Sequence, residues 1–381
     1  MNDIIDLTGS DGEEESKSIE TTLKQIPPYI HDGYAVGYAD NDIDRIMSNI
    51  RQNGFCIVDN VLTIEECEEL MFKFKDYIRE VSVGLNPSIE PNDPTTWSSF
   101  KHLYPSNGMM LKHFKVCDSD VLWSVRQNVK VASLWSKLHS TVPNDLLVSF
   151  DGGSWHPAPE HDPLRKRAPS VLKFQYHIDD NVIYDYKSVR DFDPRSPDDC
   201  MNSFKSTVQG IVLIEDIDEG DSTLDCLKGA HRHHYELCQR FIDDFKYPKK
   251  DWQKLSDEMV SFYLNKAEVE RVRLMAKRGS IFLFVSQLPH NVCQPVFPRN
   301  NPKDRMVAYV CYYPRDKASE KQLKKKREAF EDGCGTSHHP IKVIRNGKYP
   351  NTWGKGVHES LQNVTITKPT ITSFGKRLSG F

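Results

Sequence analysis

The 381-residue sequence lacks any apolar run that approaches the roughly 20 residues needed to cross a bilayer. It also lacks a recognisable targeting signal, because its N-terminus is acidic and polar, unlike a secretory or mitochondrial leader. We therefore expect a cytoplasmic or nuclear protein that is neither secreted nor inserted in a membrane.

Paired cysteines are missing too, since the nine cysteines contain no CxxC motif and follow no regular spacing. In a chain without a secretory signal, such cysteines are expected to be reduced thiols. Excess positive charge is also absent: the net charge is −4, so no overall basic field would attract nucleic acid. What remains is an ordinary globular composition, with 38% hydrophobic and 27% charged residues.

Short strand-like segments alternate from Leu146 to Tyr313, and amphipathic helical segments lie mainly outside this region. A capping-box sequence at Thr63 and Glu66 begins a predicted helix over residues 63–80. Further helices are predicted at residues 41–52, 118–140, 231–245 and 318–331. These patterns predict an α+β fold, mainly β, with a double-stranded β-helix (a cupin-like jelly roll) braced by N-terminal and peripheral helices.

Composition divides the chain into three parts. Residues 1–25 are rich in Asp, Glu, Ser and Thr, which predicts a disordered acidic tail. Residues 26–365 are expected to form a single domain with its jelly-roll core at about 145–315. Residues 366–381 are predicted to be a polar C-terminal tail.

One apolar segment interrupts the acidic tail. Ile4, Ile5 and Leu7 precede Asp11 and a run of glutamates, an arrangement that resembles a SUMO-interacting motif. In such a motif a short strand adds to the edge of a partner's sheet, and flanking acids meet basic residues. The alternative is an accidental apolar patch on a solvated tail.

The segment that organises the chemistry is residues 171–180, VLKFQYHIDD, which has the pattern of a buried strand. Because residues i and i+2 of a strand face the same side, His177 and Asp179 can direct an imidazole and a carboxylate at one point. A distant histidine, His290, follows a second apolar strand over residues 279–285. Two histidines and one carboxylate form the triad that holds non-haem Fe(II). A lone His or Asp is usually structural, so the prediction depends on the three together.

Two further motifs connect the chain to a known family. Residues 223–231 (TLDCLKGAH) and 277–284 (KRGSIFLF) match a strand-and-turn motif and a strand motif of that family. With the HxD pair and the distant histidine, the chain resembles the phytanoyl-CoA dioxygenase-like family of Fe(II)/2-oxoglutarate oxygenases. The resemblance covers roughly residues 52–340 and is patchy between the motifs.

The resemblance implies a set of cofactors and roles. It implies Fe(II) held by His177, Asp179 and His290, with 2-oxoglutarate and O2 as co-substrates and ascorbate as a candidate activator. It implies that 2-oxoglutarate is decarboxylated to succinate and CO2 while a second substrate is hydroxylated. Because Asp179 is present, hydroxylation is expected rather than the halogenation of relatives that lack this carboxylate.

The distal carboxylate of 2-oxoglutarate requires a buried cation with planar donors, which suits arginine. Arg305 is our choice because it begins the strand after His290, where the family places its arginine. Arg299, in the preceding loop, is the alternative. Some related oxygenases carry a serine two residues after the arginine, but this chain has Val307. The candidates for a polar partner on neighbouring strands are Gln175, Gln209 and Thr223.

Two classes of function remain open at this point. The first is a dioxygenase acting on an unidentified substrate, either a small molecule or a macromolecule. The second is a catalytically silent jelly-roll binding module that is recruited through its N-terminal tail. The complete triad favours the enzyme, although nothing in the sequence identifies a coenzyme A pocket.

Overall fold

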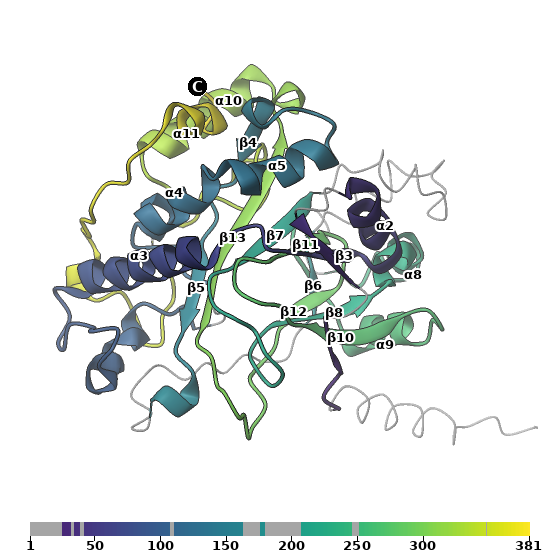
Figure 1. The fold of residues 1–381 in the computed structure, drawn as a ribbon, viewed down its shortest axis with the longest axis horizontal. Helices are drawn as coiled ribbons and strands as arrows, with labels where there is room; N and C mark the ends of the chain where they lie inside the picture. Colours follow the sequence, from purple (N-terminus) through teal and green to yellow (C-terminus); the bar gives the residue numbers. More distant parts are fainter. Residues whose placement is uncertain are drawn as a thin grey trace, which may run out of the picture.

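The computed structural model describes most of the chain (Figure 1). The residues it describes are 25–31, 34–38, 42–106, 110–162, 176–179, 207–245, 251–347 and 349–381. The N-terminal segment with Ile4, Ile5 and Leu7 lies outside the described residues, and so does Gln175.

Two β-sheets form the centre of the structure. The seven-stranded sheet contains, in spatial order, β2 (Ala35–Gly37), β3 (Phe55–Asp59), β11 (Ile281–Val285), β7 (Val208–Leu213), β13 (Arg305–Pro314) and β4 (Leu146–Val148), while β5 (Gly153–His156) also pairs with β13. The six-stranded sheet has the order β1 (Tyr29–Ile30), β10 (Glu270–Leu274), β8 (Leu224–Lys228), β12 (His290–Val292), β6 (His177–Ile178) and β9 (Gln253–Lys254). The short strands β1 and β2 therefore lie at one edge of each sheet.

The register of the seven-stranded sheet defines which side chains share its inner face. Gln209 on β7 lies opposite Phe284 on β11, and Ile211 lies opposite Tyr309 on β13. Because alternate residues of a strand point to the same side, Gln209, Phe284, Tyr309 and Arg305 all belong to one face. This face contacts the six-stranded sheet, since the Phe284 ring lies 4.8 Å from that of His290.

Helices surround the sheets. They are α2 (Ile43–Asn53), α3 (Ile64–Ser82), α4 (Asp120–Arg126), α5 (Val129–Leu138), α8 (His234–Phe241), α9 (Asp257–Leu264), α10 (Glu320–Glu331) and α11 (Ser373–Leu378). Short 3₁₀ helices occur at Pro94–His102, Val116–Asp118, Pro143–Asp145, Pro159–His161, Ala230–His233, Arg315–Lys317 and Glu359–Leu361. In Figure 1, α3, α4 and α5 lie beside β13, and α8 and α9 lie at the opposite end, near the six-stranded sheet.

Close packing joins these helices to the strands. Trp135 of α5 donates its indole N–H to the carbonyl of Val208 (2.8 Å) and packs its ring over Gly210. A Cβ at Gly210 would lie only 2.4 Å from that ring, so glycine is required for the helix to approach the sheet. In the six-stranded sheet, Ile178 and Leu227 form an apolar cluster with Leu237 of α8 and Tyr263 of α9.

Several predictions about local structure can now be compared with the coordinates. The capping box at Thr63 and Glu66 is confirmed. The single helix predicted over residues 118–140 is wrong: it is divided into α4 and α5, because the Asn128 side chain accepts hydrogen bonds from the N–H groups of Lys130 and Val131 and so begins a new helix. The eight cysteines that the structure describes are free thiols.

The C-terminal segment also differs from its prediction. Residues 366–381 were expected to form a polar tail, but they contain α11, whose Leu378 is fully buried. The carbonyl of Gly380 accepts hydrogen bonds from Arg315 (3.0 Å) and Arg327 (2.8 Å). A polar composition concealed this docking because one leucine and main-chain contacts provide much of it.

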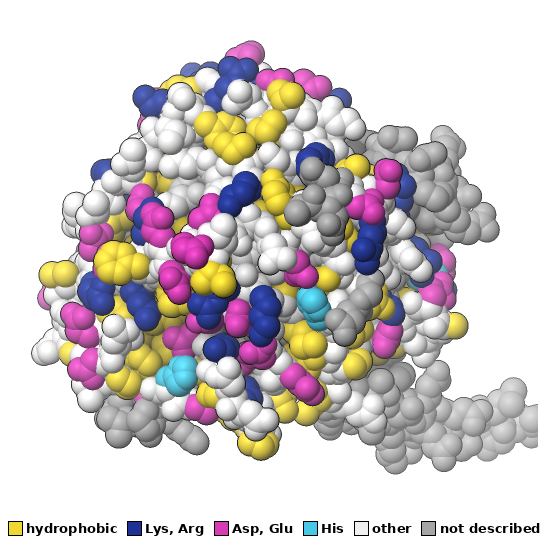
Figure 2. All heavy atoms as spheres, viewed as in Figure 1, with side chains coloured by type: hydrophobic (Ala, Val, Ile, Leu, Met, Phe, Trp, Pro, Cys, Tyr) yellow, Lys and Arg dark blue, Asp and Glu magenta, His cyan; other side chains and the backbone are white. Residues whose placement is uncertain are grey.

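The surface agrees with the small net charge. Figure 2 shows basic and acidic side chains intermixed over the visible face. Within the part of the chain that the structure describes, no helix has the length and apolar character required to traverse a lipid bilayer.

Candidate active site

Three side chains converge on one point: two lie in the six-stranded sheet, and the third follows its strand β6. His177 on β6 lies directly opposite His290 on β12, and the two ring centroids are 4.3 Å apart. Asp179 follows β6, and its N–H donates to the carbonyl of Ser286 (2.9 Å), which ties it to the end of β11. One potential ligand atom from each of the three side chains lies within 4.8 Å of the other two. The arrangement is that of a small cation site with two nitrogen donors and one oxygen donor.

Neighbouring groups orient His290. Its Nδ1 lies 2.8 Å from the carbonyl of Leu288, which can only accept, so Nδ1 carries a proton and Nε2 is the ring nitrogen that faces Asp179. Nε2 lies 3.5 Å from Oδ2 of Asp179. The Phe284 ring meets the imidazole edge to face. Hydrogen bonds of this kind fix the tautomer and ring orientation of metal-binding histidines.

The environment of Asp179 favours its ionised form. Burial would raise its pKa, but the hydrogen bond with His290 and the nearby charges of His338, His177 and His290 outweigh this effect and lower the pKa. Gln209 also donates a hydrogen bond to Oδ2 (3.0 Å). A buried carboxylate that stays charged is suited to hold a metal ion.

Arg305 provides a buried positive charge on the inner face of the seven-stranded sheet. It is 4% exposed, and its Nη2 donates to the hydroxyl of Tyr309 (3.2 Å). Among the described residues, its Nε and Nη1 atoms have no hydrogen-bond partner. A guanidinium is costly to bury with unused donors, and a bidentate carboxylate would satisfy two of them.

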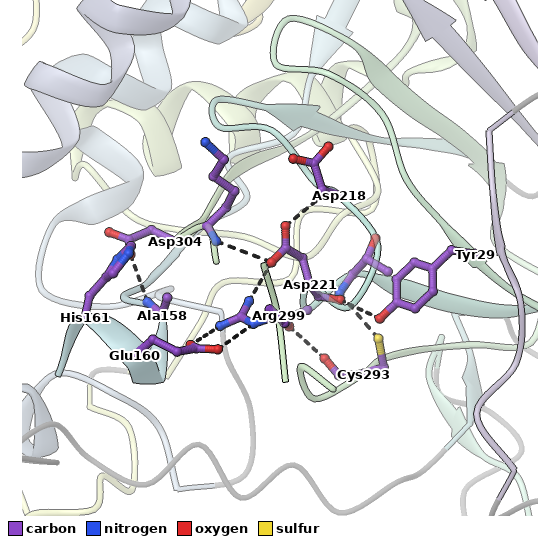
Figure 3. Close-up of polar contacts among 12 residues, drawn as sticks. Tyr29, Ala158, Glu160, His161, Asp218, Asp221, Cys293, Arg299 and Asp304 are labelled. Carbon is purple, nitrogen blue, oxygen red and sulfur yellow. Dashed lines mark hydrogen bonds and ion pairs between the residues drawn. The ribbon is translucent and has the colours of Figure 1, made fainter. Parts of the chain in front are cut away.

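Arg299, the alternative cation, is already paired. Figure 3 shows its guanidinium between two carboxylates, those of Glu160 and Asp221. Nε lies 2.8 Å from Oε1 of Glu160, Nη1 lies 2.5 Å from Oδ1 of Asp221, and Nη2 bonds the second oxygen of Glu160. The pKa of Arg299 is raised, because these two acids outweigh the effect of burial. The donors of Arg299 are therefore all bonded to carboxylates, whereas Nε and Nη1 of Arg305 have no partner among the described residues.

Asp304 fixes the chain immediately before Arg305. Its carboxylate accepts a hydrogen bond from the N–H of Ala158 (2.8 Å) and lies 2.8 Å from Nδ1 of His161 (Figure 3). It also accepts a hydrogen bond from the indole of Trp155 (3.1 Å). These contacts attach the start of β13 to β5 and the loop that follows it. The position of Arg305 is thus set by its neighbour as well as by strand pairing.

The other three residues predicted to contact 2-oxoglutarate do not lie together. Gln209 lies at the candidate metal site, where its amide donates to Asp179. It is opposite Cys311 in β13 and not beside Arg305. Thr223 donates its hydroxyl to the carbonyl of Leu274 (2.5 Å), so that group is used within the six-stranded sheet. Gln175 lies outside the described residues.

Tyr309, His338 and Trp252 lie near the site but were not predicted from the sequence. Tyr309 could have been found, because it is four positions after Arg305 and therefore on the same face of a strand. His338, whose charge acts on Asp179, lies in the segment after α10 and carries no sequence signal. Trp252 is a further neighbour: its ring centroid lies 5.8 Å from that of His177, and it remains 47% exposed.

A cluster of two histidines and one carboxylate is the kind of site found in the non-haem iron oxygenases. The chain belongs to the phytanoyl-CoA dioxygenase (PhyH) family, which it matches over residues 50–291. It is also 22% identical over 298 residues to Ava biosynthesis cluster protein O of Aspergillus versicolor, with 77% of this chain and 85% of that protein covered.

Two solved structures show a similar fold. The putative oxidoreductase from Salmonella typhimurium LT2 superposes with a TM-score of 0.55 at 15% identity, covering 97% of this chain and 92% of that one. The hypothetical protein JW0805 from Escherichia coli, at high pH, gives a TM-score of 0.52 at 15% identity, covering 97% and 89%. Family membership and the His-Asp-His site together support an iron-binding oxidoreductase of the dioxygenase type.

Proposed function

We propose that the protein is an Fe(II)- and 2-oxoglutarate-dependent dioxygenase that hydroxylates an unidentified substrate and releases succinate and CO2. The observation that carries the proposal is the pairing of two features in one interior: a His-Asp-His cluster, and a buried arginine with unused donors. A cation site alone would suit many metalloproteins, whereas the second feature calls for a carboxylate ligand. The two facing sheets are inferred to form the double-stranded β-helix of this family.

Each residue then has a definite task. His177, Asp179 and His290 would hold the iron on one side and leave the other side for 2-oxoglutarate and O2. Iron bound there would supply the redox chemistry that couples decarboxylation of 2-oxoglutarate to oxidation of the substrate. Arg305 and Tyr309 would bind the distal carboxylate of 2-oxoglutarate. Phe284, packed against His290, helps to keep water away from the ligands.

An anaerobic titration tests the proposal. Fe(II) followed by 2-oxoglutarate should produce a weak visible charge-transfer band, which requires chelation of the 2-oxo acid to the metal. His177→Ala and Asp179→Ala should abolish this band and keep the far-UV circular dichroism of the wild type. His233→Ala is a matched control, because His233 contacts Glu236 and Glu268 and is not part of the triad. A full band in both triad variants would end the assignment.

The same titration separates the enzyme from a silent binding module, which would give no band. Where the band forms, succinate release should be screened in air against metabolites and peptides, with and without ascorbate. Succinate that increases with one compound identifies the substrate. No band and no succinate release, even uncoupled, would favour the binding module.

A further inference from the structure

Gln209 holds a position that 2-oxoglutarate binding does not explain. Its side-chain nitrogen lies 3.0 Å from Oδ2 of Asp179 and 3.2 Å from Oγ of Ser286. The residue is only 9% exposed and lies on the inner face of β7. Both N–H groups of the amide are therefore directed at acceptors, one of which is the carboxylate of the proposed metal site.

The groups behind Gln209 determine which way its amide faces. The Ser286 hydroxyl donates to the carbonyl of Thr207 (3.1 Å) and lies 3.0 Å from the Thr207 hydroxyl. Ser286 therefore has lone pairs to offer the amide, and its only proton is used elsewhere. The opposite orientation of the amide would place its oxygen against the carboxylate of Asp179, which is unfavourable. The NH2 group must face Asp179.

The oxygen that Gln209 contacts is also the one nearest to the histidines. Oδ2 of Asp179 lies 3.5 Å from Nε2 of His290, so it is the oxygen on the metal side. Meanwhile the main chain of Asp179 is fixed by its hydrogen bond to the carbonyl of Ser286. Ser286 thus holds the backbone of Asp179 directly and its carboxylate through Gln209.

We propose that Gln209 is a positioning residue that fixes Asp179 as a ligand through a single oxygen. This inference rests on the proposed function of the site. Turning the carboxylate to offer both oxygens to the ion would break the hydrogen bond between the amide and Oδ2. The contact therefore favours a single-oxygen ligand and leaves a position for 2-oxoglutarate or O2. The amide also partly offsets the charge of the carboxylate without adding a charge of its own.

Two substitutions of similar size test this role. Gln209→Leu removes both hydrogen bonds, and the affinity for Fe(II) or Co(II) should fall about 10- to 100-fold. Gln209→Glu replaces the donor with a second carboxylate beside Asp179. Its metal affinity should equal or exceed that of the wild type, because negative charge is added. Its charge-transfer band with 2-oxoglutarate should be lost, because the new carboxylate competes for the open position.

The two variants should differ in metal affinity, which falls in Gln209→Leu and is kept in Gln209→Glu. A purely structural role would not produce this difference. Such a role would lower the melting temperature, the metal affinity and the band together in both variants. Gln127→Leu is a matched control: the Gln127 amide also makes side-chain bonds, to Thr370 and Thr372, but these lie near the C-terminus. This variant should bind metal and 2-oxoglutarate as the wild type does.

The outcomes separate this inference from the proposed function. A wild-type protein without a band contradicts the proposed function. A wild-type band combined with unchanged metal affinity in Gln209→Leu overturns only the role of Gln209. If Gln209→Leu does not fold, Gln209→Glu decides, and a band of wild-type intensity in that variant overturns the inference.

Discussion

Arg299 and Arg305 are both buried arginines close in sequence, yet they meet different partners. Arg299 is neutralised by two carboxylates, whereas Arg305 touches one hydroxyl and keeps unused donors on the inner face of the sheet. The sequence distinguished them only by position, because an arginine inside a strand is better fixed than one in a loop. The partners of Arg299 come from distant loops, so no local pattern could have indicated that its charge is satisfied.

The first prediction concerns the binding of 2-oxoglutarate. Arg305→Ala should raise the KM for 2-oxoglutarate by at least about 100-fold, since a buried carboxylate that loses its partner costs about 3–5 kcal/mol. Arg305→Lys should recover only part of this loss, because an ammonium cannot reproduce the planar fork. Tyr309→Phe should raise KM by about 10-fold through loss of one hydrogen bond to a charged group. The measurement is succinate release at varied 2-oxoglutarate.

Arg299→Ala is the control for this series. It should lower stability and leave the KM of the folded protein close to that of the wild type. A larger effect on KM from Arg299→Ala than from Arg305→Ala would show that the wrong cation was chosen.

Prediction from sequence was most successful where strand alternation governs the site. The spacing of His177 and Asp179, and an apolar strand before His290, were sufficient to select three side chains that the fold brings together. The groups that contact these three side chains were harder to predict. Gln209 was selected for the right strand but the wrong partner, and His338 reaches the site from a segment whose path depends on the whole fold.

At the scale of the element, β13 is held at its start by a polar cluster. Asp304 joins it to His161 and to the indole of Trp155, so the strand begins at a fixed point beside Arg305. The sequence predicted the strand from its apolar residues and gave no indication of this anchoring. Such side-chain contacts join loops that lie far apart along the chain, and periodicity carries no information about them.

A pH dependence follows from this anchoring. The hydrogen bond that His161 donates to Asp304 raises the pKa of His161, with a smaller contribution from Glu160 and opposition from burial and Arg299. Burial would raise the pKa of Asp304, but His161, the N–H of Ala158 and Trp155 together lower it. The contribution of His161 is complete below its unfolded pKa of about 6.5 and is lost as pH rises through the raised value. The contribution of Asp304 is present above about 3.8 and is lost as pH falls.

The contact should therefore stabilise the fold most between about pH 4 and 6.5. We expect the difference in unfolding free energy between wild type and His161→Gln to be larger at about pH 5.5 than at about pH 8.5. Urea denaturation at the two pH values measures it. An equal difference at both would contradict a charged His161–Asp304 contact.

The C-terminal element gives a prediction about stability. Because Leu378 of α11 is fully buried, Leu378→Ala should lower the unfolding free energy by about 2–5 kcal/mol. The exposed Val142 (55% exposed) provides a control, since Val142→Ala removes little buried surface. A disordered tail would make the two variants alike, so equal urea midpoints would restore the original prediction for this segment.

At the scale of the whole molecule, the two sheets enclose one interior, and each sheet contributes different residues of the candidate site. The six-stranded sheet provides the two histidines, and the seven-stranded sheet provides Arg305, Tyr309 and Gln209. Sequence patterns predicted the strands and their approximate limits. They did not predict which strands would be neighbours, because pairing between distant segments depends on contacts formed throughout the fold.

The N-terminal tail yields a prediction that rests on sequence alone. Replacing Ile4, Ile5 and Leu7 with Ala should abolish SUMO binding and leave 2-oxoglutarate turnover unchanged, since these residues precede the predicted domain. Binding by the wild type should be weak, about micromolar to hundreds of micromolar, because ordering a short tail costs entropy. The test is a titration of labelled SUMO followed by chemical shift. No change at about millimolar concentrations would reduce the segment to an ordinary acidic tail.

The short strands β1 and β2 have a consequence for the behaviour of the protein in solution. β1 pairs with β10 at the end of one sheet, and β2 pairs with β3 at the end of the other. β1 and β2 therefore cover an open edge in both sheets, where unpaired N–H and carbonyl groups would otherwise recruit strands from other copies. A variant shortened past this segment would expose β10 and β3 together and would be prone to aggregate, even with every residue of the metal site intact.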